Sequence, residues 1–482
     1  MRVIFSKATQ NPIFKGGFCL KTTKTHKTPQ RGVQWRVAAH GNTNLQHTPG
    51  VIMKKTLLLT ALAAATCAAA QTESPALAPE GYTLEKVTIL SRHGIRAPLV
   101  GYGSALAEAT PHTWTPWKTE GGHLTPRGGE LETRLAHYMD EWFDAVGLIK
   151  KDSCPTTDQL LVYANSLPRT IDTGKNFVKG AFPDCDITVH NLEAVGKMDN
   201  TFNPIVRSPV DDAFVAKAEK SIDDMLGEGG FAKLNERLAK NYQILETVLD
   251  YDHSATCEKE KQCDLEKIPN SLTFAQNKEP GTKGPLRNGT GAADSFILQY
   301  YEGYPANEVA WGKIETPEQW QAIVDLKNIY TDVLFTAPLL AKEAASPLLA
   351  FIQNSFADHG YQHPLIKDAQ KAKVTLLVGH DSNVASLLAL LQTAPYQLPE
   401  QYEKTPISGK VLFEQWRDKD GKALLKIEYI YQTTPQLRED SELSLKNPPQ
   451  HVTLKLEGCP TDANGFCPMD DFNRVADAAL KP

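Results

Sequence analysis

The sequence lacks a zinc-site cysteine pattern and a membrane-spanning segment, and its N-terminal segment lacks acidic residues. None of its eight cysteines forms a C-x-x-C pair, so the spacing typical of a structural zinc site is absent. The apolar run near the N-terminus, residues 57–65, is far too short to cross a bilayer. Residues 1–52 contain Lys and Arg but neither Asp nor Glu. We therefore expect neither a zinc-built scaffold nor a membrane-spanning protein, and an N-terminus unlike the rest of the chain.

Residues 53–70 carry the three parts of a secretory signal peptide. Met53-Lys54-Lys55 is a basic start, and residues 57–65 form a short apolar core. Ala68-Ala69-Ala70 then provides a small-residue cleavage site before Gln71. This segment predicts export to the periplasm.

The basic leader, residues 1–52, has no place in such a signal. We expect Met53 to be the true start and residues 1–52 to be a spurious upstream extension. A transit peptide would explain the basic leader but not the intact signal behind it. Cys67 raises the alternative of a lipoprotein, although Ala64-Ala65-Thr66 before it is a poor context for lipidation.

The mature chain is acidic. Residues 1–70 carry ten of the 51 Lys and Arg and none of the 57 Asp and Glu, which leaves a net charge of about −16. A field of that sign disfavours nucleic acid and anionic membranes as partners. We therefore expect a small-molecule partner, and an anionic ligand would have to be attracted by local arginines.

Six cysteines remain in the mature chain, and an even number fits an oxidising compartment. Six cysteines allow many pairings, so the connectivity is a separate prediction. We expect sequential neighbours to pair, namely Cys154 with Cys185, Cys257 with Cys263, and Cys459 with Cys467.

The strongest local pattern is R-H-G-x-R-x-P, residues 92–98. It follows Val87-Thr88-Ile89-Leu90, an apolar run that predicts a buried strand. His93 therefore lies between Arg92 and Arg96 where the strand ends. Two fixed cations disfavour a third, so the imidazole stays neutral and can act as a nucleophile. The guanidinium groups offer forked donors to phosphate oxygens. The alternative, an ordinary surface turn, is what a shorter Arg-His-Gly pattern would favour.

Two further apolar strands are followed by polar side chains of the same kind. Leu160–Ala164 precedes Arg169, and Val374–Val378 precedes His380 and Asp381. Because ligands of α/β proteins bind at the carboxyl ends of the strands, we expect these side chains to converge with His93 at one edge of a sheet. The convergence indicates a catalytic site that combines a nucleophile, anion donors and a carboxyl group.

The chain changes character between these strands. Helical runs and polar loops dominate residues 196–365, which we interpret as a helical cap domain. It would be inserted into an α/β domain made of residues 71–195 and 366–482. A hairpin, Val411–Trp416 with Leu424–Tyr431, would extend the sheet.

These motifs resemble the histidine acid phosphatase family over essentially the whole mature chain. The resemblance rests on R-H-G-x-R-x-P, on the distant His-Asp pair after an apolar strand, and on the export signal. Tyr163–Leu167, Val378–Asn383 and Gly458–Asp470 are most similar to the bacterial periplasmic glucose-1-phosphatases, a branch related to the bacterial phytases. Gly94 differs, because it follows the wider family where that branch carries a bulkier residue.

The resemblance implies an α/β fold of the phosphoglycerate mutase type, with a mixed sheet and a mostly helical cap. It implies an acid phosphatase that hydrolyses phosphate monoesters through a phosphohistidine, with glucose 1-phosphate as the expected substrate. His93 would be the nucleophile and Asp381 the proton donor. Glu279 would contact the substrate from the helical domain. The phosphoryl oxygens would be held by Arg92, Arg96, Arg169 and His380. No metal or other cofactor is expected.

Three other functions remain open. A phytase, which hydrolyses inositol hexakisphosphate, is the first. A mutase would share the histidine nucleophile but would normally be cytosolic. A non-enzymatic periplasmic protein that binds a phosphate ligand would leave His93 and Asp381 without a role. The oligomeric state is expected to be monomer or homodimer, with no membrane contact after signal cleavage.

We predict that the mature protein begins at or near Gln71. Edman sequencing of the protein purified from periplasmic extract should find that N-terminus. Material that retains residues 1–52 would contradict both the start site and the signal.

Overall fold

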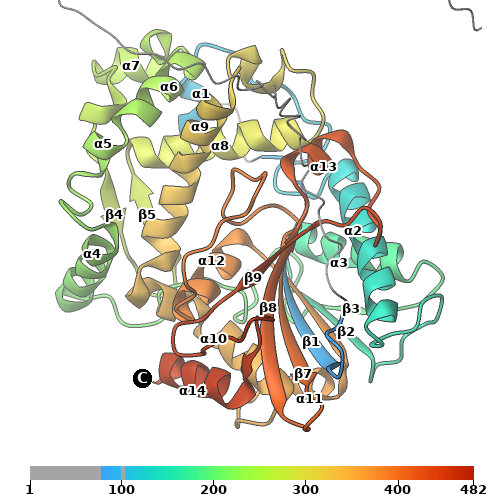
Figure 1. The fold of residues 1–482 in the computed structure, drawn as a ribbon. Helices are drawn as coiled ribbons and strands as arrows, with labels where there is room; N and C mark the ends of the chain where they lie inside the picture. Colours follow the sequence, from blue (N-terminus) through green and yellow to red (C-terminus); the bar gives the residue numbers. More distant parts are fainter. Residues whose placement is uncertain (1–76, 99–103, 482) are drawn as a thin grey trace, which may run out of the picture. The chain divides into compact units, whose positions relative to one another are not determined.

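The computed structural model describes residues 77–98 and 104–481, so the expected leader and signal peptide, residues 1–70, lie outside the described range. The described chain is built on a mixed eight-stranded sheet with strand order β10-β8-β7-β1-β6-β2-β3, and β9 pairs with β8 (Figure 1). β1, β6, β2 and β3 pair in parallel, whereas β7 to β10 are antiparallel to their neighbours. The mixed sheet confirms the predicted fold class.

The strands and helices have the following ranges. The large sheet contains β1 (Thr83–Arg92), β2 (Leu160–Ala164), β3 (Val189–His190), β6 (Val374–Gly379), β7 (Lys410–Arg417), β8 (Ala423–Tyr431), β9 (Gln450–Leu454) and β10 (Cys467–Pro468). A second, two-stranded sheet contains β4 (Ser271–Thr273) and β5 (Gly281–Lys283). The α-helices are α1 (Ala105–Glu108), α2 (Pro126–Ala145), α3 (Pro168–Ala181), α4 (Asp212–Leu226), α5 (Leu234–Arg237), α6 (Ala239–Leu249), α7 (Ala255–Glu260), α8 (Pro285–Tyr301), α9 (Pro317–Thr331), α10 (Pro338–Phe356), α11 (Ile366–Lys371), α12 (Asp381–Leu390), α13 (Thr434–Glu439) and α14 (Met469–Leu480). Shorter turns are η1 (Tyr251–His253), η2 (Leu265–Lys267), η3 (Val309–Gly312) and the π-helical η4 (Asp332–Thr336).

Helices cover both faces of the sheet because its central strands are apolar on both sides. In β1, Leu90 belongs to the core formed with α10, α12 and α14. Val87 and Ile89 belong to the opposite core, formed with α2 and α3. Figure 1 shows these two helical groups on either side of the strands. β6 is buried at every residue, as its continuous apolar sequence predicts.

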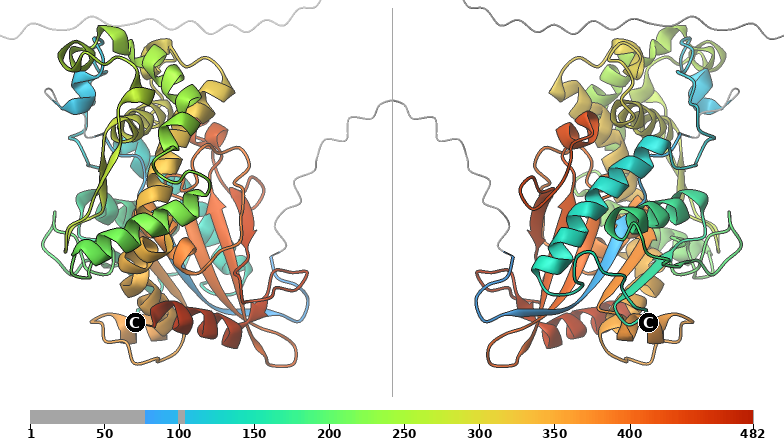
Figure 2. Two further views of the ribbon diagram at one scale, coloured as in Figure 1. Left: turned by 90° about the vertical axis from the view of Figure 1, so that its left-hand side faces the viewer. Right: turned by 90° about the vertical axis from the view of Figure 1, so that its right-hand side faces the viewer.

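Helices α4 to α9, within residues 212–331, form a third cluster that we call the helical layer (Figure 2). The sequence predicts one helical domain over residues 196–365. α10 falls in that range, but its Leu348, Phe351 and Ile352 pack in the core of the sheet. The reason is its composition, because a helix with this much apolar surface is buried against a sheet rather than left in a thin outer layer.

No single helix in the described ranges is both long and apolar enough to cross a membrane. Pro317–Thr336 and Pro338–Phe356 meet that test only as a pair, and the two segments are bent by 75°.

The three predicted disulfides are confirmed, and each links sequential cysteines: Cys154–Cys185, Cys257–Cys263 and Cys459–Cys467. Asp252 lies close enough to the second pair for all three side chains to ligate one metal ion. The disulfide leaves neither of those sulfurs as a thiolate, so this cluster does not suit a metal. Disulfides of this kind fit an oxidising compartment.

The register of the parallel strands places their carboxyl ends together. β1 and β6 end opposite each other at Arg92 and Gly379, and β2 ends at Ala164, opposite Val378. The residues that follow the three strands therefore leave the sheet side by side: His93, Asn165 and His380.

The first turn of α2 supports the loop after β1. Thr125 caps the helix by accepting a hydrogen bond from the Gly128 N–H at 2.9 Å. Gly128 itself lies against the backbone of Ile95. A methyl group at Gly128 would overlap the Ile95 carbonyl oxygen and lie 2.8 Å from the Ile95 nitrogen.

Gly128→Ala is therefore predicted to displace the loop that carries His93. We expect a loss of about 1–3 kcal/mol in the free energy of unfolding together with a fall in activity. Gly129→Ala is the matched control, because its methyl group would meet only the Asn176 side chain, which can move. Thermal unfolding and steady-state kinetics of both variants test this expectation, and equal losses in the two would contradict it.

Candidate active site

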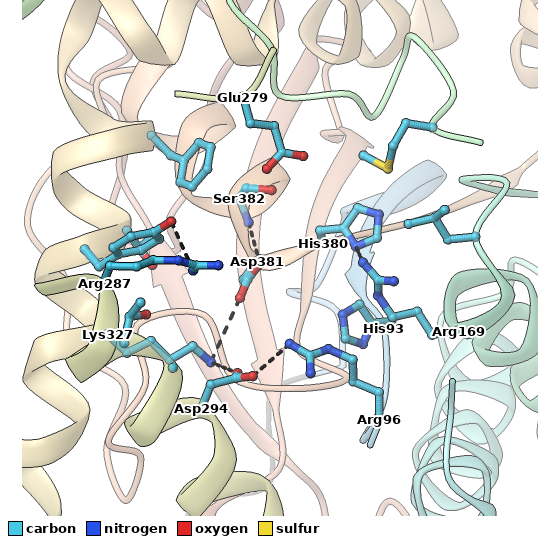
Figure 3. A pocket seen from close by; sticks show the side chains of 17 residues that line it. His93, Arg96, Arg169, Glu279, Arg287, Asp294, Lys327, His380, Asp381 and Ser382 are labelled. Atoms are coloured by element: carbon cyan, nitrogen blue, oxygen red, sulfur yellow. Dashed lines mark hydrogen bonds and ion pairs between the residues drawn. The ribbon is translucent and has the colours of Figure 1, made fainter. Parts of the chain in front are cut away.

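A cavity of about 420 Å³ lies where the helical layer meets the carboxyl ends of β1, β2 and β6. Its charged and imidazole side chains converge from both sides, as Figure 3 shows. The strand ends contribute His93, Arg96, Arg169, His380 and Asp381. The helical layer contributes Glu279, Arg287, Asp294 and Lys327. Of the predicted site residues, only Arg92 does not line the cavity.

His93 is a neutral imidazole with one unprotonated ring nitrogen. It is 3 % exposed, and burial, with the charges of Arg169 and the other arginines, holds the pKa of His93 well below its usual value. Its Nδ1 lies 2.8 Å from the carbonyl oxygen of Gly94. Since a carbonyl oxygen only accepts, Nδ1 carries the proton. Nε2 therefore keeps the lone pair that a nucleophile requires.

Arg169 and Arg96 bring positive charge to the cavity wall. Arg169 lies in the first turn of α3, and burial, followed by the nearby Arg96, lowers its pKa to about 10, so that it stays charged at neutral pH. Its Nε has no hydrogen-bond partner in the described part of the chain. Arg96 is held by an ion pair from Nη2 to Oδ2 of Asp294 at 2.8 Å. A buried cation with an unused donor fits an anionic ligand.

Arg92 lies behind the cavity, where it holds other charged groups. Its Nη1 donates to Glu403 Oε1 at 2.9 Å and to the Thr405 carbonyl oxygen at 2.5 Å. Its Nη2 is 3.6 Å from Oδ2 of Asp381. Within residues 77–98 and 104–481, Nε makes no hydrogen bond, and Nη2 has only this ion pair. Nε and Nη2, two neighbouring donors of the guanidinium group, are therefore the pair that Arg92 could offer to a ligand.

Asp381 is the first residue of α12, and its side chain reaches the cavity with 32 % of its surface exposed. Oδ1 accepts a hydrogen bond from the Ser382 N–H at 2.9 Å. Burial would raise the pKa of the Asp381 carboxyl, but the charges of Arg92 and Lys327 outweigh burial and hold that pKa below its usual range. The protein by itself therefore keeps Asp381 as a carboxylate.

The sequence analysis missed four charged residues of the site: Arg287 in the cavity wall, and Asp294, Lys327 and Glu403. Lys327 Nζ lies 2.5 Å from Oε1 of Glu403 and 3.0 Å from Oδ1 of Asp294. Glu403 in turn binds Arg92. These ion pairs connect Asp294 and Lys327 of the helical layer, through Glu403, to Arg92, the residue before His93.

One of these residues left a signal in the sequence. Lys327 follows Ile323 and Val324 at helical spacing, so it occupies a core position of α9, and a lysine there is out of pattern. A buried lysine needs a carboxylate partner, which would have directed attention to the cavity. Glu403 lies in a loop without periodicity and left no such signal.

Glu279 extends into the cavity from the loop before β5, as expected (Figure 3). Burial and the charge of Asp381 raise the pKa of Glu279, although Arg169 and Arg287 act in the opposite direction. Arg287 lies over the ring of Tyr330 at 5.8 Å. This side of the cavity therefore presents both an acceptor and a cation.

Known proteins resemble the chain over most of its length. Residues 83–432 match the histidine phosphatase superfamily (branch 2). The chain is 45 % identical to the glucose-1-phosphatase of Salmonella typhimurium over 433 residues, which are 89 % of this chain and 100 % of that protein. It is 33 % identical to phytase AppA of Escherichia coli, over 83 % of this chain and 92 % of that one. The solved apo structure of Hafnia alvei phytase has a TM-score of 0.79 and 31 % identity, and it covers 84 % of this chain and 98 % of its own.

Proposed function

The chain belongs to the histidine phosphatase superfamily, branch 2, and is a histidine acid phosphatase; we propose that it hydrolyses glucose 1-phosphate through a phosphohistidine at His93. One observation carries the proposal. A single cavity holds a neutral histidine with an unprotonated Nε2, arginine donors and a carboxylate. These are the groups that a phosphoryl transfer through a covalent intermediate needs.

The first half of the reaction forms the intermediate. Nε2 of His93 attacks phosphorus, and the N–P bond forms as the P–O bond to the leaving group breaks. The ring becomes positively charged, and the hydrogen bond from Nδ1 to the Gly94 oxygen stabilises it. Arg92, Arg96 and Arg169 donate to the phosphoryl oxygens, whose charge grows in the transition state.

Asp381 transfers the proton in both halves of the reaction. It protonates the leaving oxygen, and it then accepts a proton from the water that attacks the phosphohistidine and releases phosphate. The carboxylate must first gain a proton. A bound phosphate offsets the cations that depress the pKa of Asp381, and a monoanionic ester can supply the proton. We therefore expect kcat/KM to fall as pH rises above about 6, where a phosphate monoester loses its second proton.

The charges around the cavity favour a substrate with one phosphate group. Four cationic and three carboxylate side chains line the cavity, and Asp294 already binds Arg96 and Lys327. A cavity whose positive and negative charges nearly cancel suits a sugar phosphate better than a polyphosphate. Glu279 would accept a hydrogen bond from a sugar hydroxyl and would repel additional phosphate groups.

A phytase is the second candidate. The similarity to Hafnia alvei phytase favours it, and so does Arg287. Arg287 lines the cavity and makes no ion pair with a carboxylate elsewhere in the described chain. The two substrates separate these candidates directly.

The setting of the enzyme is also part of the proposal. The three disulfides support action in the periplasm. The acidic net charge supports the absence of nucleic-acid and membrane partners. We propose a monomer or homodimer in which residues 212–331 act as a helical cap over the cavity.

His93→Ala is predicted to abolish turnover without lowering Tm, because it removes the nucleophile from a pocket held by other residues. Asp381→Asn should slow the reaction by about 100-fold or more, with a larger loss for a poor leaving group such as glucose than for p-nitrophenol. Rapid-quench trapping with radiolabelled substrate should place the label on His93 in the wild type. Activity should survive EDTA.

Two kinds of result would contradict these expectations. Label on serine or aspartate, or no label at all, would contradict the phosphohistidine. Equal losses for both leaving groups in Asp381→Asn would remove this residue as the proton donor.

We predict that the wild type prefers glucose 1-phosphate to phytate and that Glu279→Gln shifts the ratio of the two kcat/KM values toward phytate by about tenfold, the effect of one charge interaction. Glu315→Gln is the matched control, because it removes an exposed carboxylate outside the cavity. An unchanged ratio in Glu279→Gln would exclude a contact with substrate. An initial preference for phytate would favour the second candidate.

A further inference from the structure

Asn165 is a fully buried side chain that the mechanism above does not use. It follows β2 directly, and its backbone is fixed at both polar groups. The N–H donates to the Val378 carbonyl oxygen at 2.9 Å, and the carbonyl oxygen accepts from Oγ1 of Thr170 at 2.6 Å. The side chain therefore starts from a rigid position.

The orientation of the Asn165 carboxamide is determined by its neighbours. Oδ1 accepts hydrogen bonds from the backbone N–H groups of Ser166, at 2.8 Å, and Asp199, at 2.9 Å. A backbone N–H can only donate, so the oxygen of the carboxamide must face these two groups. Nδ2 consequently faces the other way, where it lies 2.6 Å from Nε2 of His380.

This contact determines where His380 carries its proton. The amide nitrogen of Asn165 is a donor, so Nε2 of His380 must accept. A neutral imidazole has one donor and one acceptor nitrogen, which leaves the proton on Nδ1. His380 is neutral because burial, followed by the charge of Arg169, holds its pKa well below the usual value.

Nδ1 of His380 lies 3.3 Å from Nη2 of Arg169. A guanidinium group has no acceptor, so with the proton on Nδ1 these two nitrogens are both donors and cannot bond to each other. Both residues line the cavity beside His93, whose ring centre is 5.5 Å from that of His380 (Figure 3). Two adjacent N–H groups without an acceptor suit the oxygen of a bound phosphoryl group.

We propose that Asn165 is a positioning residue that fixes His380 as the Nδ1–H tautomer, so that His380 and Arg169 donate together to one phosphoryl oxygen. The inference rests on the proposed function of the cavity as a phosphate site. With the opposite tautomer, Nδ1 would accept a hydrogen bond from Nη2 of Arg169, so the site would lose the donor of His380 and that N–H of Arg169 would be occupied.

Charged groups approach His380 from each element packed around it. Arg169 comes from α3, Asp381 from α12, and Arg92 and Arg96 from the end of β1 and the loop after it. The arginines disfavour the imidazolium form, whereas Asp381 favours it. The wild-type His380 should therefore remain a single neutral tautomer over the pH range of the test.

The tautomer can be observed directly in the folded mature enzyme. Protein labelled with ¹⁵N in histidine should show Nδ1 of His380 protonated and Nε2 unprotonated, with the assignment made from a His380→Asn sample. A spectrum with the proton on Nε2 would overturn the proposal.

Asn165→Asp inverts the contact with almost no change in shape. At low pH the introduced carboxyl group and the His380 ring share two protons. One lies between the carboxyl group and Nε2, and the other is on Nδ1. When this pair of groups loses one proton, the remaining one lies on Nε2, bonded to the carboxylate, and Nδ1 becomes an acceptor. The Kd of inorganic phosphate for this variant, divided by the wild-type Kd, should therefore rise by at least about tenfold between pH 5 and pH 8.5, as one charge-assisted hydrogen bond is lost.

Asn354→Asp is the matched control. Asn354 is 2 % exposed, and its Oδ1 also accepts from two backbone N–H groups, those of His359 and Tyr361, but it lies on α10 outside the cavity. Its Kd ratio should stay near one at both pH values, whatever it loses in Tm. A pH-independent ratio in Asn165→Asp, or the same rise in Asn354→Asp, would overturn the positioning role.

These results are separable from a failure of the proposed function. If the wild type released no phosphate from any monoester while the tautomer and the phosphate binding followed the expectation, the positioning role would stand and the enzymatic function would fall. If turnover occurred through His93 while His380 carried its proton on Nε2, the reverse would hold.

Discussion

The structure depends on keeping a buried imidazole neutral among fixed cations. Arg92, Arg96 and Arg169 surround His93, and like charges brought together in a dry site repel one another strongly. The protein offsets this repulsion with carboxylates, because Glu403 binds Arg92 and Asp294 binds Arg96. Unlike the three arginines, His93 can lose its charge at neutral pH, so the repulsion favours its unprotonated form. That form is the nucleophilic one.

The same balance connects the sheet to the helical layer. Asp294 and Lys327 come from α8 and α9, whereas Arg96 and Asp381, with which they form ion pairs, follow the ends of β1 and β6. The electrostatics of the cavity therefore require both parts in place, and a displaced helical layer would leave charges at the strand ends uncompensated. The pKa of Asp381 depends on this arrangement as well, since Lys327 is one of the cations that lower it.

Much of the site could be predicted from the sequence because strand ends are local signals. The apolar runs before His93 and His380 predict buried strands, and parallel neighbours bring their ends together without further information. Arg92 shows what the sequence could not predict. Alternation along a strand indicates which face of the sheet a side chain occupies, but it does not identify the partner, and the partner of Arg92, Glu403, is 311 residues away. α10 shows a similar limit, because periodicity identifies it as a buried helix but does not tell which core buries it.

A pH titration of the His93 ring by ¹⁵N NMR tests the central claim most directly. We expect Nδ1 to stay protonated and Nε2 to stay unprotonated as the pH falls through and below the ordinary histidine midpoint of about 6.5, with a normal titration restored when the protein is unfolded. A folded enzyme in which His93 becomes an imidazolium near pH 6.5 would contradict the claim that the surrounding cations hold it neutral.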